Sequence, residues 1–416
     1  MHIPKITRRS LLAGAGASLA GASMAALGGP AEKAGAGASP TATAGWSPAL
    51  LDRAREGNYF IVDGVVHWAN MLPNNRRLKR DWEHATDWGY SYHAQTCPEP
   101  YRLTRKQYVR NWKVDESMDI CLLETPTDIL VYHSTPLYYA FWDGLMSNEK
   151  GANMKGEHPD RTIWYAAIDM FDPLPAIKAK IDEVTAQGAE GLKFYPTRVN
   201  PETNASEAWF MDDPKKAMPV FEYARAAGCR HIAIHKLLEY TGPETPALGI
   251  ADMYKVAAAF PDVTWDLVHA GWALLEPTLE LMRKHDNVTA VFEGPMFWLI
   301  YDMPRFHRMM DGFMTKADVD RLIFSSAAVR THPYWQVAGM MNYQAPEGAK
   351  WKMTDAAKRK IMGENAARIY GIDIAQRRRA IADDRWSREL RANGLREPYA
   401  AQRAEVDREA EVLERG

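Results

Sequence analysis

The chain has 416 residues, of which 46% are hydrophobic and 11% are aromatic, so it holds enough apolar material for a large core. Its 51 basic and 53 acidic residues give a formal net charge of -2, without the basic excess typical of nucleic-acid-binding proteins. This composition excludes an intrinsically disordered chain and argues against a nucleic-acid partner.

Residues 1–44 are predicted to be an export signal and linker. The paired Arg8 and Arg9 are followed by an uncharged run from Leu11 to Gly29, made mainly of Ala, Gly, Ser and Leu. This pattern is typical of a twin-arginine signal. The run is too rich in glycine for a membrane anchor, which needs about 20 strongly apolar residues. We therefore expect the Tat export machinery to carry the protein to the periplasm or beyond, without stable membrane insertion.

Short apolar runs alternate with helix-like segments along residues 45–373. Eight runs are predicted as strands, at residues 59–62, 119–123, 162–168, 191–195, 231–235, 263–269, 288–292 and 321–324. Helix-like apolar spacing occupies, among others, residues 175–187, 214–227 and 250–260. Alternating strands and helices imply parallel pairing, and no glycine-rich loop follows the first strand as a dinucleotide-binding sheet would require. We predict an α/β protein with a (βα)8 TIM barrel.

Two segments lie outside this repeat. Residues 71–117 follow strand one and contain seven Tyr or Trp residues, which predicts either a lid over the barrel mouth or a packed subdomain. Residues 374–416 are predicted as a charged helical extension, which lies either on the surface or in a subunit contact. In the second case the protein would be a homo-oligomer. The spacing of Cys97, Cys121 and Cys229 fits no metal motif, and leaves free buried thiols or one disulfide as alternatives.

Three histidines are candidate metal ligands. His67, His235 and His269 each end a predicted strand, and the carboxyl ends of barrel strands converge where chemistry occurs. A lone histidine is more often a core or loop residue, but three on strands one, five and six predict a site. Three imidazoles hold a divalent ion and leave one position open for water, whose pKa the ion lowers. Side-chain alternation places Asp63 on the same face as His67.

Several motifs appear in a fixed order between residues 57 and 373. They are IVDGVVH at 61–67, GLKFYP at 191–196, IH at 234–235, LVHAGW at 267–272 and GENAARIYG at 363–371. With these motifs the chain resembles the amidohydrolase-related proteins, which include metal-dependent hydrolases and aromatic-acid decarboxylases with a TIM-barrel fold. The resemblance implies zinc, or in some members manganese, held by histidines that match His67, His235 and His269.

The chain departs from the family pattern at two positions. Val65 stands where the family often has the first ligand of strand one, and Ala327 stands where an aspartate after strand eight usually binds metal and accepts the proton of water. Candidate substitutes are His332 as base or ligand and Glu293 at the end of strand seven. Lys193, at the end of strand four, would pair with an anionic substrate or form a structural ion pair.

Three functions follow from these residues. The first is a metal-dependent hydrolase of a small organic substrate, with an apolar or aromatic part suggested by the aromatic insertion. The second, an alternative that the missing aspartate strengthens, is a metal-dependent aromatic-acid decarboxylase. The third is a barrel that has lost catalysis and only binds a ligand. The sequence does not name the substrate.

Overall fold

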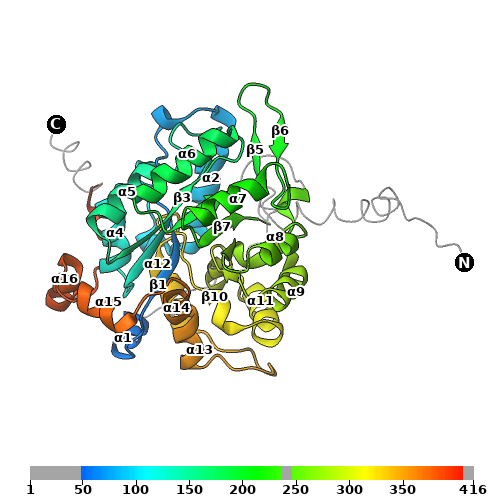
Figure 1. Cartoon of the computed structure of the whole chain (residues 1–416). Helices are drawn as coiled ribbons and strands as arrows, with labels where there is room; N and C mark the ends of the chain where they lie inside the picture. The colour runs from blue at the N-terminus through cyan, green and yellow to red at the C-terminus, as the bar shows by residue number, and fades with distance from the viewer. Residues whose placement is uncertain (1–47, 237–245, 406–416) are drawn as a thin grey trace, which may run out of the picture. The chain divides into compact units, whose positions relative to one another are not determined.

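The centre of the computed structural model, which describes residues 48–236 and 246–405, is an eight-stranded parallel sheet curled into a barrel (Figure 1). In sheet order the strands are β1 (Val62–Val66), β2 (Ile129–His133), β3 (Thr162–Ala167), β4 (Gly191–Phe194), β7 (His231–His235), β8 (Thr264–Val268), β9 (Val288–Val291) and β10 (Leu322–Ile323). The barrel closes because Gly64 N–H donates to Phe324 O at 2.9 Å and Ala327 N–H donates to Val65 O at 3.0 Å. The predicted (βα)8 barrel is confirmed.

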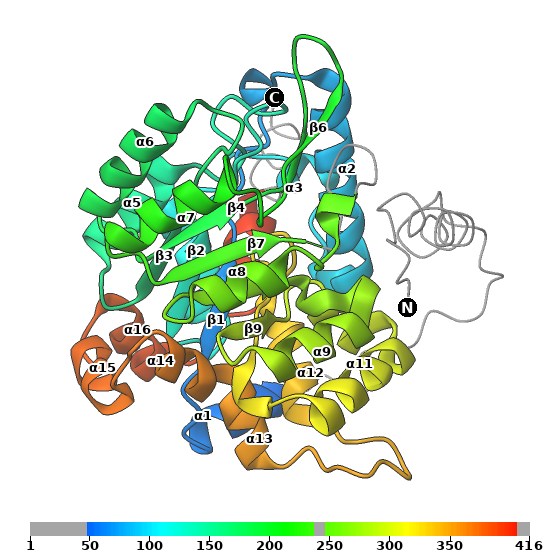
Figure 2. The same ribbon diagram turned by 45° about the vertical axis from the view of Figure 1, so that its right-hand side comes forward.

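Helices surround the barrel (Figure 2). Those that lie between or after strands are α4 (Val114–Leu123), α5 (Asn148–Glu157), α6 (Leu174–Ala186), α7 (Ala217–Ala226), α8 (Met253–Ala259), α9 (Leu275–Lys284), α10 (Trp298–Tyr301), α11 (Met303–Lys316) and α12 (Pro333–Asn342). The helices α1 (Pro48–Glu56), α13 (Asp355–Arg359) and α14 (Asn365–Ile369) lie before and after the barrel, with a π-helical turn (Lys360–Glu364) joining the last two. A small hairpin of β5 (Thr197–Val199) and β6 (Ser206–Ala208) follows β4.

Two apolar clusters bury the two faces of the barrel strands. One cluster fills the barrel interior and includes Val62, Val131, Tyr165, Ala233 and Ile323. The larger cluster lies between the outer faces of the strands and the helices. Since successive side chains of a strand point to opposite faces, seven of the eight barrel strands contribute to both clusters, whereas β4 contributes only to the outer cluster and carries Lys193 on its interior face.

The prediction for strand two is wrong, because residues 119–123 belong to helix α4. Its apolar residues Ile120–Leu123 are buried against the outer barrel wall, and a short apolar run cannot be assigned to strand or helix by periodicity alone. The second strand is Ile129–His133, which pairs with β1 and β3.

Strand β1 carries an irregularity that changes which side chains face the mouth. The register with β2 shifts between Asp63 and Val66, so Val62 and Val65 both lie in the interior cluster. The Asp63 carboxylate instead accepts hydrogen bonds from the backbone N–H and the hydroxyl of Ser326. The expectation that Asp63 shares a face with His67 is therefore wrong, since a bulge breaks simple alternation.

The aromatic insertion contains α2 (Lys79–Thr96) and α3 (Arg105–Tyr108) and packs on segments that follow the last two strands. Tyr92 of α2 contacts Phe297, with ring centroids 5.3 Å apart, and Tyr101 contacts Trp335 at 5.8 Å. Because the chain leaves the carboxyl end of a strand on the mouth side, these contacts place part of the insertion beside the mouth.

The C-terminal extension is helical, as expected, over α15 (Ile374–Ile381) and α16 (Arg385–Asn393). It docks on the barrel through Arg161, whose guanidinium bonds to Asp384 at 2.6 Å. The boundary at residue 374 stays a prediction, and the predicted signal at residues 1–44 lies outside the described residues.

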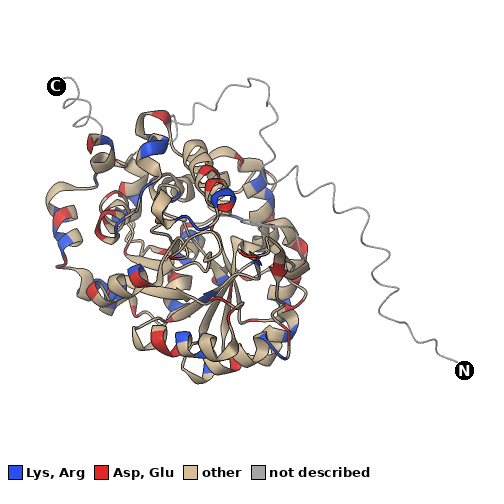
Figure 3. Ribbon diagram, turned by 90° about the horizontal axis from the view of Figure 1, so that it is seen from above, with Lys and Arg blue, Asp and Glu red and all other residues tan. Residues whose placement is uncertain are grey.

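The distribution of charged residues and the state of the cysteines can both be compared with the sequence analysis. Acidic and basic residues are interspersed along the helices in Figure 3, in keeping with the near balance of 53 acidic and 51 basic residues. All three cysteines are free and buried. Among the described residues, no helix is both long and apolar enough to cross a membrane.

Candidate active site

His67 lies just beyond the end of β1 with both ring nitrogens occupied. Its Nδ1 lies 2.9 Å from the backbone oxygen of His133, and its Nε2 lies 3.2 Å from Glu293 Oε1. The side chain is 2% exposed. Both groups that face the ring, the backbone oxygen of His133 at Nδ1 and the Glu293 carboxylate at Nε2, are hydrogen-bond acceptors.

His269 reaches the mouth because the strand geometry ends one residue before it. Strand β8 stops at Val268, and His269, Ala270 and Gly271 follow with φ values of 70°, 49° and 65°. At Gly271 a Cβ would lie 1.9 Å from Thr278 Oγ1, so only glycine fits. The His-Ala-Gly sequence is therefore the turn that directs the imidazole into the mouth.

His235 and His269 form a close pair. His269 Nε2 lies 3.2 Å from His235 Nδ1, and His269 Nδ1 lies 3.0 Å from the backbone oxygen of Glu293. The ring of Tyr195 stacks on His235 with centroids 4.1 Å apart. Burial lowers the pKa of His269 to about 4, which leaves it as a neutral imidazole at pH 7.

Glu293 connects the histidines of the two sides of the mouth. Its carboxylate contacts His67, and its backbone oxygen contacts His269. Burial would raise its pKa, but the neighbouring side chains of His269, His67 and Lys193 outweigh burial and hold the pKa well below its usual range. The side chain is therefore an anion at the centre of the site.

Lys193 is the third residue of β4 and points into the barrel interior beside Ala233 of β7. It is fully buried, and among the described residues its Nζ has no hydrogen-bond partner. Desolvation lowers its pKa to about 8, so the ammonium form still predominates at neutral pH. No described carboxylate lies within ion-pair distance, so the structural ion pair considered from the sequence is not formed.

The sequence analysis missed His133, which ends the true second strand. It is 1% exposed, and neither ring nitrogen has a hydrogen-bond partner in the described part of the chain. Its ring stacks on Tyr165 with centroids 4.4 Å apart and meets His67 edge-on at 6.4 Å. The signal was available, because Ile129–His133 ends in histidine as His231–His235 does, but the misplaced strand hid it.

His332 stands apart from this group. Its Nδ1 accepts the backbone N–H of Tyr334 at 3.0 Å and caps helix α12, so its Nε2 must carry the proton that is donated to Glu124 at 2.6 Å. The Glu124 carboxylate also accepts Tyr399 N–H at 2.7 Å. Both nitrogens of His332 are committed to structural bonds, which argues against the base or ligand role expected for it.

The two family departures leave the mouth without two polar side chains. Val65 packs in the interior cluster. Ala327 is buried in a left-handed conformation with φ of 57°, and its N–H is bonded to Val65 O. Position 327 therefore offers no carboxylate to the site, and the carboxylate that contacts His67 is that of Glu293.

A divalent ion fits the chemistry of the donors. Two ligand atoms at about 2.1 Å from one tetrahedral ion lie about 3.4 Å apart. The pairs His67–Glu293 and His235–His269 each have their facing atoms 3.2 Å apart. The carbonyl bonds at Nδ1 of His67 and His269 are the usual means of orienting a metal-binding imidazole. Within residues 48–236 and 246–405, however, no three of these donors have ligand atoms that all lie within 4.8 Å.

Two other features of the described surface do not belong to the site. Asp115, Glu157 and His158 come close enough to hold an ion, but both acids are exposed and Asp115 pairs with Arg385 at 3.4 Å.

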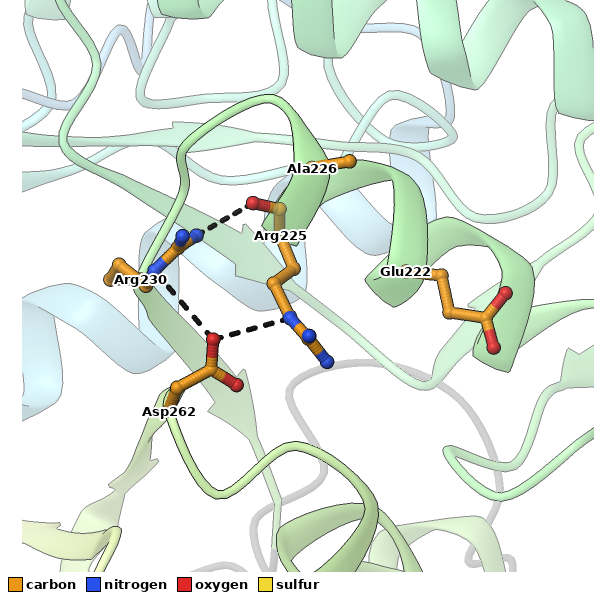
Figure 4. A pocket seen from close by; sticks show the side chains of 5 residues that line it. All are labelled: Glu222, Arg225, Ala226, Arg230 and Asp262. Carbon is orange, nitrogen blue, oxygen red and sulfur yellow. Dashed lines mark hydrogen bonds and ion pairs between the residues drawn. The ribbon is translucent and has the colours of Figure 1, made fainter.

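A depression of about 540 Å³ is lined by Arg225, Arg230 and Asp262 among others (Figure 4). It lies where β7 and β8 begin, at the end opposite to His235 and His269, and its side chains pair with each other, with Arg225 Nε 3.2 Å from Asp262.

Comparisons with known proteins agree with this geometry. The family model described as amidohydrolase matches residues 123–372, more than half of the chain. No curated protein matches the sequence.

Several solved structures share the fold. An uncharacterised TIM-barrel protein from Bordetella bronchiseptica is 15% identical, with a TM-score of 0.55 over 75% of this chain and 98% of that chain. A 2,6-dihydroxybenzoate decarboxylase from Rhizobium is 12% identical, with a TM-score of 0.51 over 75% and 99% of the two chains. A 5-carboxyvanillate decarboxylase from Novosphingobium aromaticivorans with bound manganese is 13% identical, with a TM-score of 0.50 over 76% and 98%. At these identities the likeness shows the fold alone.

Proposed function

Because this chain belongs to the amidohydrolase family of TIM-barrel enzymes, we propose that it is a metal-dependent hydrolase of a small organic substrate. The observation that carries the proposal is the unpartnered imidazole of His133, which lies in the same interior as the donor pairs His67–Glu293 and His235–His269. A hydrolase needs a group that takes a proton from water, and His133 supplies one where Ala327 does not.

The donor pairs would hold the ion, with zinc as the proposed metal and manganese as the alternative. When bound, such an ion lowers the pKa of water and polarises a carbonyl. The chain's own residues would do the rest: the backbone oxygen of His133 orients His67, the backbone oxygen of Glu293 orients His269, and the imidazole of His133 accepts the proton. Family membership and the manganese in the 5-carboxyvanillate decarboxylase support a divalent metal.

Aromatic side chains beside the mouth support a substrate with an apolar or aromatic part. Trp272, next to His269, stacks on Trp298 with centroids 5.0 Å apart, and Phe297 meets Tyr92 of the insertion. Because Phe297 and Trp298 are adjacent in sequence, these contacts connect the insertion with the imidazole of His269. Flat, polarisable faces of this kind bind planar groups well.

The test uses His133→Phe, which keeps a ring to stack on Tyr165 and removes both nitrogens. Purified wild-type protein should contain a divalent metal and hydrolyse at least one ester, lactone or amide of a broad panel. The variant should keep its metal and lose about 100- to 10,000-fold in rate, as removal of a general base does. A variant with undiminished hydrolysis would rule out His133 as the base, and active metal-free protein would rule out the mechanism.

Decarboxylation of an aromatic acid is the second candidate. It is favoured by the ammonium of Lys193, which has no hydrogen-bond partner among the described residues, and by the missing acid at Ala327, because it requires no activated water. Release of carbon dioxide from hydroxybenzoate-type acids would establish it, and no release across such a panel would count against it.

We also propose that the chain is exported by the twin-arginine route and acts in the periplasm or outside the cell. The paired Arg8 and Arg9 and the uncharged run after them support this. Replacing both arginines with lysine should retain the protein in the cytoplasm in its uncleaved form. Equal export of the variant would contradict the proposal.

A further inference from the structure

Lys193 is a buried cation whose Nζ has no hydrogen-bond acceptor among the described residues. It lies below the histidines, and Asp266, its neighbour in the interior, already accepts bonds from Thr289 at 2.5 Å and from Tyr165. Lys193 Nζ also lies 5.6 Å from the ring centre of Tyr195, the residue that stacks on His235. A buried ammonium whose three N–H donors are unmatched is unfavourable by several kcal/mol, so a partner from outside the described chain is expected.

The contrast with a second buried lysine shows how unusual this environment is. Lys236 is as deeply buried, but its Nζ donates to Asp252 at 2.6 Å, to Gly249 O at 2.7 Å and to Ala247 O at 2.8 Å. The fold therefore provides an acceptor for each N–H donor of the buried ammonium of Lys236. Lys193 faces the candidate site and is left unsatisfied.

His133 is another interior residue whose side-chain nitrogens have no hydrogen-bond partner in the described part of the chain, and it lies on the strand two places from β4 in the sheet. His133 pairs with Tyr165 of β3 and Lys193 pairs with Ala167 of β3, so the two interior side chains flank β3 at levels two residues apart. A neutral imidazole offers one N–H donor and one acceptor, so it can donate to a ligand with one nitrogen and accept a proton with the other.

We propose that Lys193 and the N–H of His133 form a carboxylate subsite, and that the substrate is therefore a small organic acid. The inference rests on the proposed function, because the subsite adjoins the donor pairs of that active site. One positive charge and two donors from different strands match the single charge and two oxygens of a carboxylate. The stacked rings of Trp272 and Trp298 receive the rest of the molecule.

The experiment measures binding by isothermal calorimetry, with benzoate and its uncharged analogue benzamide as probes and the whole mature protein as the receptor. Wild-type protein should bind benzoate at least about tenfold more tightly than benzamide. Lys193→Met should weaken benzoate binding by about tenfold or more and leave benzamide unchanged, as expected for loss of a charge-assisted bond. His133→Phe should weaken benzoate binding by a smaller factor. The exposed Lys352→Met is the matched control and should change neither.

Three outcomes would overturn the proposal. They are benzoate binding no tighter than benzamide, undiminished benzoate binding to Lys193→Met, and tighter binding of inorganic phosphate than of benzoate. The first and third need only the wild-type protein, so the proposal is tested even if the variant fails to fold. The wild-type titration is repeated after the metal has been removed with a chelator. If Lys193 binds the anion, the preference for benzoate over benzamide persists; if a metal binds it, the preference is lost. Absence of turnover alone would contradict the proposed function and leave this binding result standing.

Discussion

Asp63 gives a quantitative test of how the strand-eight loop is held against β1. Its carboxylate is fully buried, and desolvation raises its pKa to about 7, although bonds from Ser326 act in the opposite direction. An unfolded aspartate has a pKa of about 3.9. The folded state therefore favours the protonated form, and stability that is fully present below about pH 4 is lost as pH rises to about 7.

The magnitude follows from the two pKa values. Between pH 5 and pH 8 the contribution of Asp63 falls by about 2.5 kcal/mol. Asp63→Asn keeps an acceptor for the Ser326 N–H and does not titrate. The free energy of unfolding of the variant, measured relative to wild type, should rise by about that amount over this range.

The assay is urea unfolding of both proteins at several pH values, with fluorescence as the signal. Asp128, whose burial raises its pKa to about 6, titrates in both proteins and cancels in their difference. A difference in unfolding free energy that is the same at pH 5 and pH 8 would refute the assignment of a protonated carboxyl to Asp63.

Two further predictions concern packing around the barrel. Glu124→Gln should lower the unfolding free energy by about 3 kcal/mol, because it removes the buried anion that binds His332, while Glu183→Gln in an exposed pair should change it by less than about 1 kcal/mol. Gly64→Ala should destabilise by about 1–3 kcal/mol, since a Cβ there would lie 2.5 Å from Ile323 Cγ2, whereas Gly156→Ala meets no atom within 4 Å and should be neutral or stabilising; thermal unfolding measures both.

The barrel and the positions of His67, His235 and His269 could be predicted because both follow from local patterns. A histidine at the end of a buried β-prone run falls at the mouth whenever the strands are parallel. The same reasoning would have found His133, but an apolar stretch at residues 119–123 was taken for the strand. That stretch covers the outside of the barrel, and its apolar character reflects burial and not secondary structure.

The partners within the site depend on contacts between residues far apart in sequence. Glu293 meets His67 across 226 positions, and His332 meets Glu124 across 208. His332 follows strand eight closely enough to resemble a replacement for the missing aspartate. Only the fold shows that its ring caps α12 and is bonded to the end of α4.

The central claim is that the donor pairs at the mouth hold a catalytic divalent ion. The most direct measurement is the metal content of protein that has been folded and exported in its own host, determined by elemental analysis. The account predicts about one zinc or manganese ion per chain in wild-type protein, and marked loss in a folded His269→Asn variant, because too few ligands remain. Wild-type protein without metal but with full activity would contradict it.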